Sequence, residues 1–169
     1  RISHFHINPN TKSSQFYFPV GKALKGVKIE IRRLENYDSK VGLVFISGTS
    51  LMSGYIKNRK LNDTLLIKGW YNTGDLGFFD KNKNLYLTGR EDNTFSVGHE
   101  KLCPEEVESV IQEKFNIQEI AITKIRNKIL DWIPFGVVVR KSKIKITSNT
   151  IISGLKDDLS NYKIPKKIV

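Results

Sequence analysis

Two charged residues that each follow a glycine are the first candidates for chemistry in this sequence: Asp75, which follows Gly74, and Arg90, which follows Gly89. A carboxylate accepts hydrogen bonds from hydroxyl groups, and a guanidinium offers a planar fork of donors that stays charged at any working pH. Taken alone, an Asp after Gly is typical of a turn, and an Arg at the end of a strand is typical of a surface ion pair. The residue types therefore permit a binding site here without requiring one.

His99 and Cys103 are two further candidates for reactive side chains. The pKa of a histidine lies near neutrality, so His99 is either a general base or, more commonly, a surface residue. Cys103 precedes an expected helix, whose N-terminus would activate a thiol, but a small buried residue is the more frequent role. Because Cys103 is the only cysteine, a disulfide framework and a Cys-rich zinc site are excluded, and we expect a reducing, cytoplasmic location and no metal site.

The composition describes a globular and basic chain of 169 residues. The 28 Lys and Arg exceed the 17 Asp and Glu by 28 − 17 = +11, which favours anionic partners such as nucleotides, coenzyme A, nucleic acid or an acidic membrane. The basic residues are spread along the chain, so we interpret them mainly as a solvated surface and expect no nucleic acid. No apolar run approaches the roughly 20 residues of a transmembrane segment.

The first half of the sequence has the pattern of β-structure. Apolar and charged residues alternate over 27–34, and 42–47 is a short apolar run between turn residues. The polar run 80–84 separates two apolar stretches, which is a hairpin pattern. Residues 1–18 have no clear period and are interpreted as loop with at most one strand.

The pattern changes after residue 90. Pro104 can occupy the first turn of a helix that runs to about residue 114, and two strand-like runs follow at 119–125 and 134–140. Ser148 is the expected N-cap of a second helix whose apolar spacing continues to Leu159. The whole predicts an α+β fold, with a β-rich, barrel-like part followed by a smaller α+β part.

Several motifs resemble those of one family. Residues 70–77, W-Y-N-T-G-D-L-G, and 89–93, G-R-E-D-N, closely resemble two signature motifs of the adenylate-forming superfamily, which includes acyl-CoA synthetases, nonribosomal adenylation domains and luciferases. Four further segments are similar to motifs of that family in the same order: 20–27 (V-G-K-A-L-K-G-V), 48–55 (G-T-S-L-M-S-G-Y), 104–108 (P-E-E-V-E) and 162–165 (Y-K-I-P). The resemblance covers nearly everything from Val20 to Val169.

The resemblance implies a role for each matched residue. Asp75 would accept hydrogen bonds from the ribose hydroxyls of ATP, Arg90 would lie beside the same sugar, and Asp92 would be the hinge about which a small domain swings. Residues 1–91 would then be the C-terminal subdomain of a large adenylation domain. Residues 92–169 would be most of the small mobile domain, truncated before its end.

Three departures from the family pattern accompany this resemblance. The Gly-rich phosphate loop and most of the large domain are absent, and the catalytic lysine is expected in a G-K motif beyond Val169, so no catalytic residue is assigned. Lys163, Lys166 and Lys167 are not taken as substitutes. In the loop after the hinge, Ser96 stands where Lys is common and His99 where a second Gly usually lets the thiol arm pass. Either the loop is shifted so that Gly98 serves, or the acceptor differs, or the reaction stops at adenylation.

The function that the resemblance implies is that of a C-terminal fragment of an ATP-dependent, acyl-adenylate-forming ligase, inactive by itself. The parent enzyme would be an acyl-CoA synthetase that uses ATP, Mg²⁺, coenzyme A and a small-molecule carboxylate, and the missing N-terminal part of the large domain would be its structural partner. The alternatives are an adenylation domain that loads a carrier protein, a noncatalytic adenylation remnant, and a basic binding module without catalysis.

Overall fold

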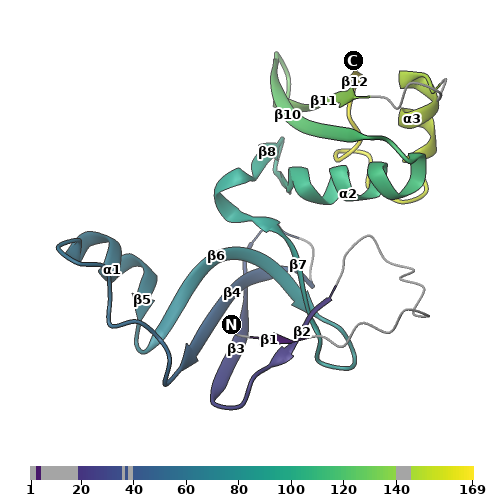
Figure 1. Cartoon of the computed structure of the whole chain (residues 1–169). Coiled ribbons are helices and arrows are strands. Elements are labelled where there is room, and N and C mark those ends of the chain that lie inside the picture. The colour runs from purple at the N-terminus through teal and green to yellow at the C-terminus, as the bar shows by residue number, and fades with distance from the viewer. Residues whose placement is uncertain (1–2, 5–18, 36, 38–39, 140–145) are drawn as a thin grey trace. The chain divides into compact units, whose positions relative to one another are not determined.

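The computed structural model describes residues 3–4, 19–35, 37, 40–139 and 146–169. The chain forms two compact units, Arg1–Asp92 and Asn93–Val169 (Figure 1). Strands dominate the first unit and strands with helices make the second, which confirms the predicted α+β class. The predicted loop 1–18 lies outside the described residues except for Ser3–His4. The assignment of 1–91 and 92–169 to a large and a small domain stays a prediction.

One curled antiparallel sheet forms the first unit (Figure 1). Its strands run in the order β1-β2-β7-β6-β4-β3, and β5 pairs with β6 beside this path. Their bounds are β1 Ser3–His4, β2 Pro19–Ala23, β3 Val27–Arg33, β4 Gly42–Gly48, β5 Leu66–Ile67, β6 Trp70–Phe79 and β7 Leu85–Arg90. Since β6 lies between β4 and β7, it is a central strand of this sheet.

The core of this sheet forms where the sequence is most apolar. β3 and β4 confirm the strands predicted from the alternation over 27–34 and the run 42–47, and they pair along their whole length. Leu43, Val44 and Phe45 of β4 are buried together with Leu76 of β6 and Leu85 of β7. A continuous buried run is typical of a central strand covered on both faces, so these residues fix the positions of β6 and β7.

The predicted hairpin over 80–84 is confirmed and has a defined turn. The Asp80 carboxylate accepts hydrogen bonds from the backbone N–H groups of Asn82 and Asn84, at 2.9 and 2.7 Å, and from the Asn84 side-chain amide at 2.9 Å. Desolvation by itself would raise the pKa of Asp80, but these hydrogen bonds together outweigh it and lower the pKa below its ordinary value. An Asp that binds its own following backbone sets the turn, and the turn sets the pairing of β6 with β7.

A short helix, α1 (Arg59–Leu65), has no counterpart in the sequence analysis. It begins after Asn58, whose side chain accepts a hydrogen bond from the Leu61 N–H at 3.2 Å, and none of its seven residues is buried. The apolar residues in this stretch are too few to show a helical period, which explains the missing prediction.

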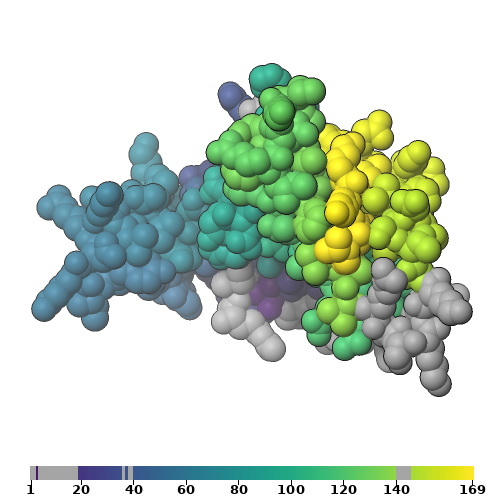
Figure 2. Space-filling model, turned by 90° about the horizontal axis from the view of Figure 1, so that it is seen from above, coloured from purple at the N-terminus to yellow at the C-terminus, as the bar shows by residue number. Residues whose placement is uncertain are grey.

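The second unit combines two small sheets with two helices. β10 and β11 form an antiparallel hairpin, β12 adds in parallel to β11, and β8 pairs with β9. Figure 2 shows the yellow C-terminal segment, which contains β12, beside the green β10–β11 hairpin. The bounds are β8 Phe95–Val97, β9 Glu100–Leu102, α2 Pro104–Phe115, β10 Glu119–Asn127, β11 Asp131–Val139, α3 Ser148–Gly154 and β12 Lys167–Ile168, and a 3-10 turn, η1, covers Glu91–Asn93.

Helix α2 follows its sequence prediction closely. Pro104 stands at its start, and Val107, Val110 and Ile111 form its buried face. It ends one residue later than predicted, because Asn116 adopts the left-handed conformation (φ 48°) that closes many helices.

Helix α3 differs from its prediction at both ends. Its N-cap is Thr147, whose side chain accepts from the Thr150 N–H, whereas the predicted cap, Ser148, is the first helical residue and donates its hydroxyl to the Ile168 carbonyl at 2.6 Å. The helix stops at Gly154, so Leu159 is buried from a turn instead of from a helix. No helix in the described ranges is long and apolar enough to cross a membrane.

A buried ion pair joins α2 to the segment that leads into β12. The Lys163 ammonium donates to both carboxylate oxygens of Glu106, at 2.6 and 2.8 Å, and only 10% of the Lys163 side chain is exposed. Lys163 therefore has a structural partner, which agrees with not assigning it to catalysis. A second pair, Lys114 with Asp158, joins the end of α2 to the turn after α3 but is more exposed.

We predict that Glu106→Ala lowers the free energy of unfolding of the second unit by about 3 kcal/mol, because it leaves the buried Lys163 ammonium without its counterion. Asp158→Ala is the matched control and should cost less than about 1 kcal/mol, because Lys114 remains hydrated. Guanidinium unfolding followed by Trp132 fluorescence, in a Trp70→Phe background, measures both. Equal costs for the two substitutions would contradict the prediction.

Candidate functional site

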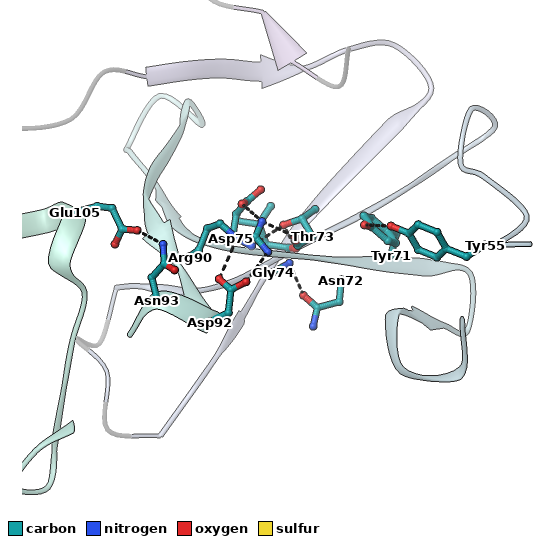
Figure 3. A network of polar contacts seen from close by, with 11 residues as sticks. Tyr55, Tyr71, Asn72, Thr73, Gly74, Asp75, Arg90, Asp92, Asn93 and Glu105 are labelled. Carbon is teal, nitrogen blue, oxygen red and sulfur yellow. Dashed lines mark hydrogen bonds and ion pairs between the residues drawn. The ribbon is translucent and has the colours of Figure 1, made fainter. Parts of the chain in front are cut away.

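The register of β6 against β7 places the two sequence-predicted binding residues opposite each other. Asp75 pairs with Arg90 across the strands, and the Arg90 Nη1 lies 3.3 Å from the Asp75 Oδ1 (Figure 3). About 32% of the Asp75 side chain and 48% of the Arg90 side chain are exposed, so both charges can meet a ligand. Neighbours 15 residues apart in sequence thus form one polar site.

Arg90 is held by a second carboxylate, that of Asp92. Arg90 Nε donates to Asp92 Oδ1 at 3.0 Å and Nη2 donates to Oδ2 at 3.2 Å, a two-point contact between the guanidinium fork and the carboxylate (Figure 3). The hydrogen bond from Arg90 to Asp92 and the charge of Asp92 raise the pKa of Arg90 above its ordinary value. The guanidinium is therefore permanently charged and fixed in direction between two anionic groups.

The part of β6 just before Asp75 holds that residue in place. The Thr73 hydroxyl donates to the Val44 carbonyl at 2.9 Å and accepts from the Asp75 N–H at 3.0 Å, which ties the backbone of Asp75 to β4. Gly74 has φ +74°, and a Cβ there would lie 2.9 Å from Arg90 Nη2. The backbone conformation favours glycine at this position, and a larger residue would also displace the end of the Arg90 side chain.

A second hydrogen-bonded pair, without a sequence prediction, joins Tyr71 on β6 to Tyr55 in the segment before α1. The hydroxyl groups of Tyr55 and Tyr71 lie 3.1 Å apart (Figure 3). This hydrogen bond, more than partial burial, raises the pKa of Tyr71, so the phenol stays protonated at neutral pH. Nothing in the spacing of two tyrosines 16 residues apart signals such a pair.

The predicted hinge residue stands at the boundary of the two units. The first unit ends at Asp92 and the second begins at Asn93, within the short turn η1. Asn93 in turn donates to the Glu105 carboxylate at 2.6 Å. Asp75, Arg90 and Asp92 are thus brought together in the first unit, and a swing about Asp92 stays a prediction.

Gly98 and His99, the predicted thiol-passage residues, form the two-residue turn between β8 and β9 in the second unit. Gly98 has φ +63°, a conformation that glycine adopts without steric cost at the first position of such turns, and its N–H bonds the Leu130 carbonyl at 3.4 Å. Both residues are exposed, so the imidazole of His99 reaches solvent. Their role toward a thiol stays a prediction.

Cys103 lies in the core of the second unit, where 5% of the residue is exposed. Its thiol donates to a carboxylate oxygen of Glu105 at 3.1 Å. Burial, reinforced by this bond and by the negative charge of Glu105, raises the pKa of the thiol far above its ordinary value. The structure therefore supports the buried interpretation of Cys103 over the activated one.

Among the described residues, no three or more His, Cys, Asp or Glu side chains lie together so that they could hold a metal ion. The polar atoms that the site offers are instead the Asp75 carboxylate as acceptor and the Arg90 guanidinium as donor, a set suited to neighbouring hydroxyl groups on a sugar.

The comparisons with known proteins find relatives that are ligases. No family model matches the chain. The 2-succinylbenzoate–CoA ligase of Bacillus licheniformis is 30% identical over 148 residues, which cover 86% of this chain and 30% of that protein. The chain thus spans about 30% of the length of the curated relatives that it matches.

Solved structures show the same fold. The amide bond synthetase McbA from Marinactinospora thermotolerans matches with a TM-score of 0.79 and 25% identity over 89% of this chain and 32% of that one. The o-succinylbenzoate–CoA synthetase MenE from Bacillus subtilis, solved with ATP and magnesium, matches with a TM-score of 0.75 and 28% identity over 89% and 31%. Another structure of MenE contains its acyl-adenylate intermediate.

We predict that Cys103 in the folded protein does not react with a disulfide reagent such as DTNB at pH 8. Because its pKa is raised, the thiolate fraction at a given pH falls, and burial excludes the reagent as well. Absorbance at 412 nm should show release of one equivalent only after guanidinium is added, and rapid release from the native protein would contradict the prediction.

Proposed function

This chain belongs to the adenylate-forming superfamily, of which it forms the C-terminal portion, and we propose that its parent protein is an ATP-dependent acyl-CoA synthetase. The parent would activate a small-molecule carboxylate as an acyl-adenylate and transfer the acyl group to coenzyme A. The observation that carries the proposal is the pairing of Asp75 with Arg90 on an exposed part of β6 and β7. The cytoplasmic location expected from the sequence stays a prediction.

The site is suited to the nucleoside part of ATP. Asp75 would accept hydrogen bonds from the two ribose hydroxyls, and Arg90 would lie beside the sugar with its direction fixed by Asp92. ATP, when bound, supplies the adenylyl group, and pyrophosphate is the leaving group. Within this chain the residues bind and orient the sugar, and we assign no ligand of Mg²⁺ and no catalytic residue to the described part.

The hinge proposal adds a mechanical role to Asp92. In a reaction with two half-steps, one mobile unit can serve both if a few residues absorb the change in φ and ψ. Asp92 stands at the boundary of the units and is bonded to Arg90. A swing there would alter the surroundings of the nucleotide site as well as the position of the second unit.

The turn Gly98–His99 is the proposed passage for the thiol. Gly98 has no side chain and has a positive φ in this turn. The next residue, His99, adds an exposed imidazole. Coenzyme A is the acceptor that the ligase relatives favour. A carrier protein is the second candidate, because His99 would narrow a passage for a free pantetheine arm, and a noncatalytic remnant is the third.

We predict that Asp75→Ala in the parent protein lowers carboxylate-dependent exchange of labelled pyrophosphate into ATP by about tenfold to a hundredfold. This loss corresponds to hydrogen bonds to a charged acceptor worth about 1.5–3 kcal/mol. Asp157→Ala, which removes an exposed carboxylate in the second unit, is the control and should leave exchange unchanged. Wild-type exchange by the Asp75→Ala variant would remove Asp75 from the nucleotide site.

We also predict that His99→Gly raises the rate of thioester formation from coenzyme A by about threefold or more while pyrophosphate exchange stays the same, because only the thiol half-reaction uses the passage. His99→Ala should give a smaller rise. Single-turnover transfer from preformed acyl-adenylate measures the step directly. A lower rate in both variants would instead indicate that the imidazole assists the thiol.

A further inference from the structure

Both carboxylate oxygens of Glu105, in the first turn of α2, are bonded within the second unit. One oxygen accepts a hydrogen bond from the Asn93 side-chain amide at 2.6 Å (Figure 3), and the other accepts from the Cys103 thiol at 3.1 Å. The buried face of α2 anchors this helix in the core, and a carboxylate in the first turn is favoured by the helix dipole. Asn93, an exposed residue, is thereby tied to a rigid element of the second unit.

The residue before Asn93 is tied to the other unit. Both carboxylate oxygens of Asp92 accept hydrogen bonds from Arg90 at the end of β7, at 3.0 and 3.2 Å. Two consecutive residues are therefore bonded through their side chains to different units, and the boundary of the units lies between them. Because the peptide bond that joins them is planar, the rotatable backbone bonds of this link are those of ψ at Asp92 and φ at Asn93.

More of the backbone could turn without the bond from Asn93 to Glu105. The core of the second unit begins at Phe95, of which 5% is exposed. Rotation at Asn93 could therefore also change the direction in which the chain enters this core, and the bond to Glu105 restrains it. A hinge limited to fewer dihedral angles gives the moving part fewer orientations.

We propose that Glu105 is a positioning residue for the movement of the second unit: it holds Asn93 against α2 and so confines the swing to the link between Asp92 and Asn93. This inference rests on the proposed function, in which one mobile unit serves two half-reactions. The turn Gly98–His99 follows the hinge closely in sequence, and the angle at which the swing stops decides where this turn meets the thiol. Because misplacing reacting groups by about 1 Å can cost about 100-fold in rate, a loose hinge should slow the transfer step.

The test removes the bond from either end in the parent protein. Asn93→Ala and Glu105→Ala should each slow single-turnover transfer from preformed acyl-adenylate to coenzyme A by about threefold to tenfold. The double variant should be no slower than the slower single variant, because the two side chains act through one bond. Glu105→Gln, whose side-chain oxygen can still accept from Asn93, should keep most of the rate. In all variants the KM for ATP in pyrophosphate exchange should stay within about twofold, because Asp75 and Arg90 keep their bonds.

Glu113→Ala is the matched control, because Glu113 is an exposed glutamate on the same helix. It removes the same charge as Glu105→Ala and should leave the transfer rate unchanged. Equal slowing by Glu113→Ala would attribute the effect to the charge of the helix, and additive losses in the double variant would show that the two side chains act independently. Either result would overturn the proposal.

Spin labels measure the hinge itself without any reaction. Labels at two exposed positions, Lys81→Cys in the first unit and Ile129→Cys in the second, report the spread of distances between the units. In the ligand-free parent, Asn93→Ala should broaden this spread by about half or more, whereas Glu113→Ala should leave it unchanged. Because Asn93 is exposed, its substitution should leave the fold intact. An unchanged spread would overturn the proposal, and so would a broader spread with an unchanged transfer rate.

The two measurements separate this inference from the proposed function. If no carboxylate supports pyrophosphate exchange but Asn93→Ala broadens the spread, the proposed function fails and the restraint that Glu105 places on the hinge stands. If exchange and transfer both occur and the variants alter neither rate nor spread, the proposed function stands and the positioning role of Glu105 fails.

Discussion

The antiparallel register of β6 and β7 is the constraint on which the site depends. Asp75 and Arg90 face each other only because the Asp80 turn and the irregularity between Leu76 and Gly77 set which residues pair. A shift by one residue would send the Asp75 side chain to the opposite face of the sheet. The buried side chains on β4, β6 and β7 oppose such a shift, so the apolar core is also what specifies the polar pair.

The parts of the fold that the sequence predicts are those with a clear hydrophobic period. The helix that begins at Pro104 buries a regular set of apolar side chains, the hairpin around Asp80 buries Leu76 and Leu85, and the apolar side chains of the alternation over 27–34 are half-buried. The elements without a prediction include β2, α1, β5, β8, β9 and β12, and none of these has more than seven residues. The predicted end of α3 was wrong. Leu159 is buried, but it lies in a turn after the helix, and a buried turn residue can fall at helical spacing.

The site could be predicted only in part from residue types. Taken alone, Asp75 is typical of a turn residue and Arg90 of a surface residue. Only the order and spacing of the motifs around them identify both as candidate binding residues. Their partners follow from three-dimensional contacts that no local pattern encodes: Thr73 bonds a carbonyl 29 residues away, and Tyr55 bonds Tyr71 across 16 residues. A regular hairpin extended from the Asp80 turn would have paired Asp75 with Gly89, so the pairing with Arg90 depends on the irregularity between Leu76 and Gly77, which the sequence pattern does not reveal.

Arg90 links the two proposed roles of this chain, because one guanidinium serves both Asp75 and Asp92. Three of its nitrogens are used, Nη1 toward Asp75 and Nε and Nη2 toward Asp92. A rotation of the backbone at Asp92 must therefore carry the guanidinium with it or break two hydrogen bonds. The Arg90 and Asp92 side chains are 48% and 65% exposed, so solvent screens their ion pair and breaking it is a small barrier. In the proposed enzyme, a hinge movement could thus reorient a residue at the nucleotide site at little energetic cost, whereas a buried pair such as Glu106 with Lys163 would resist the same movement.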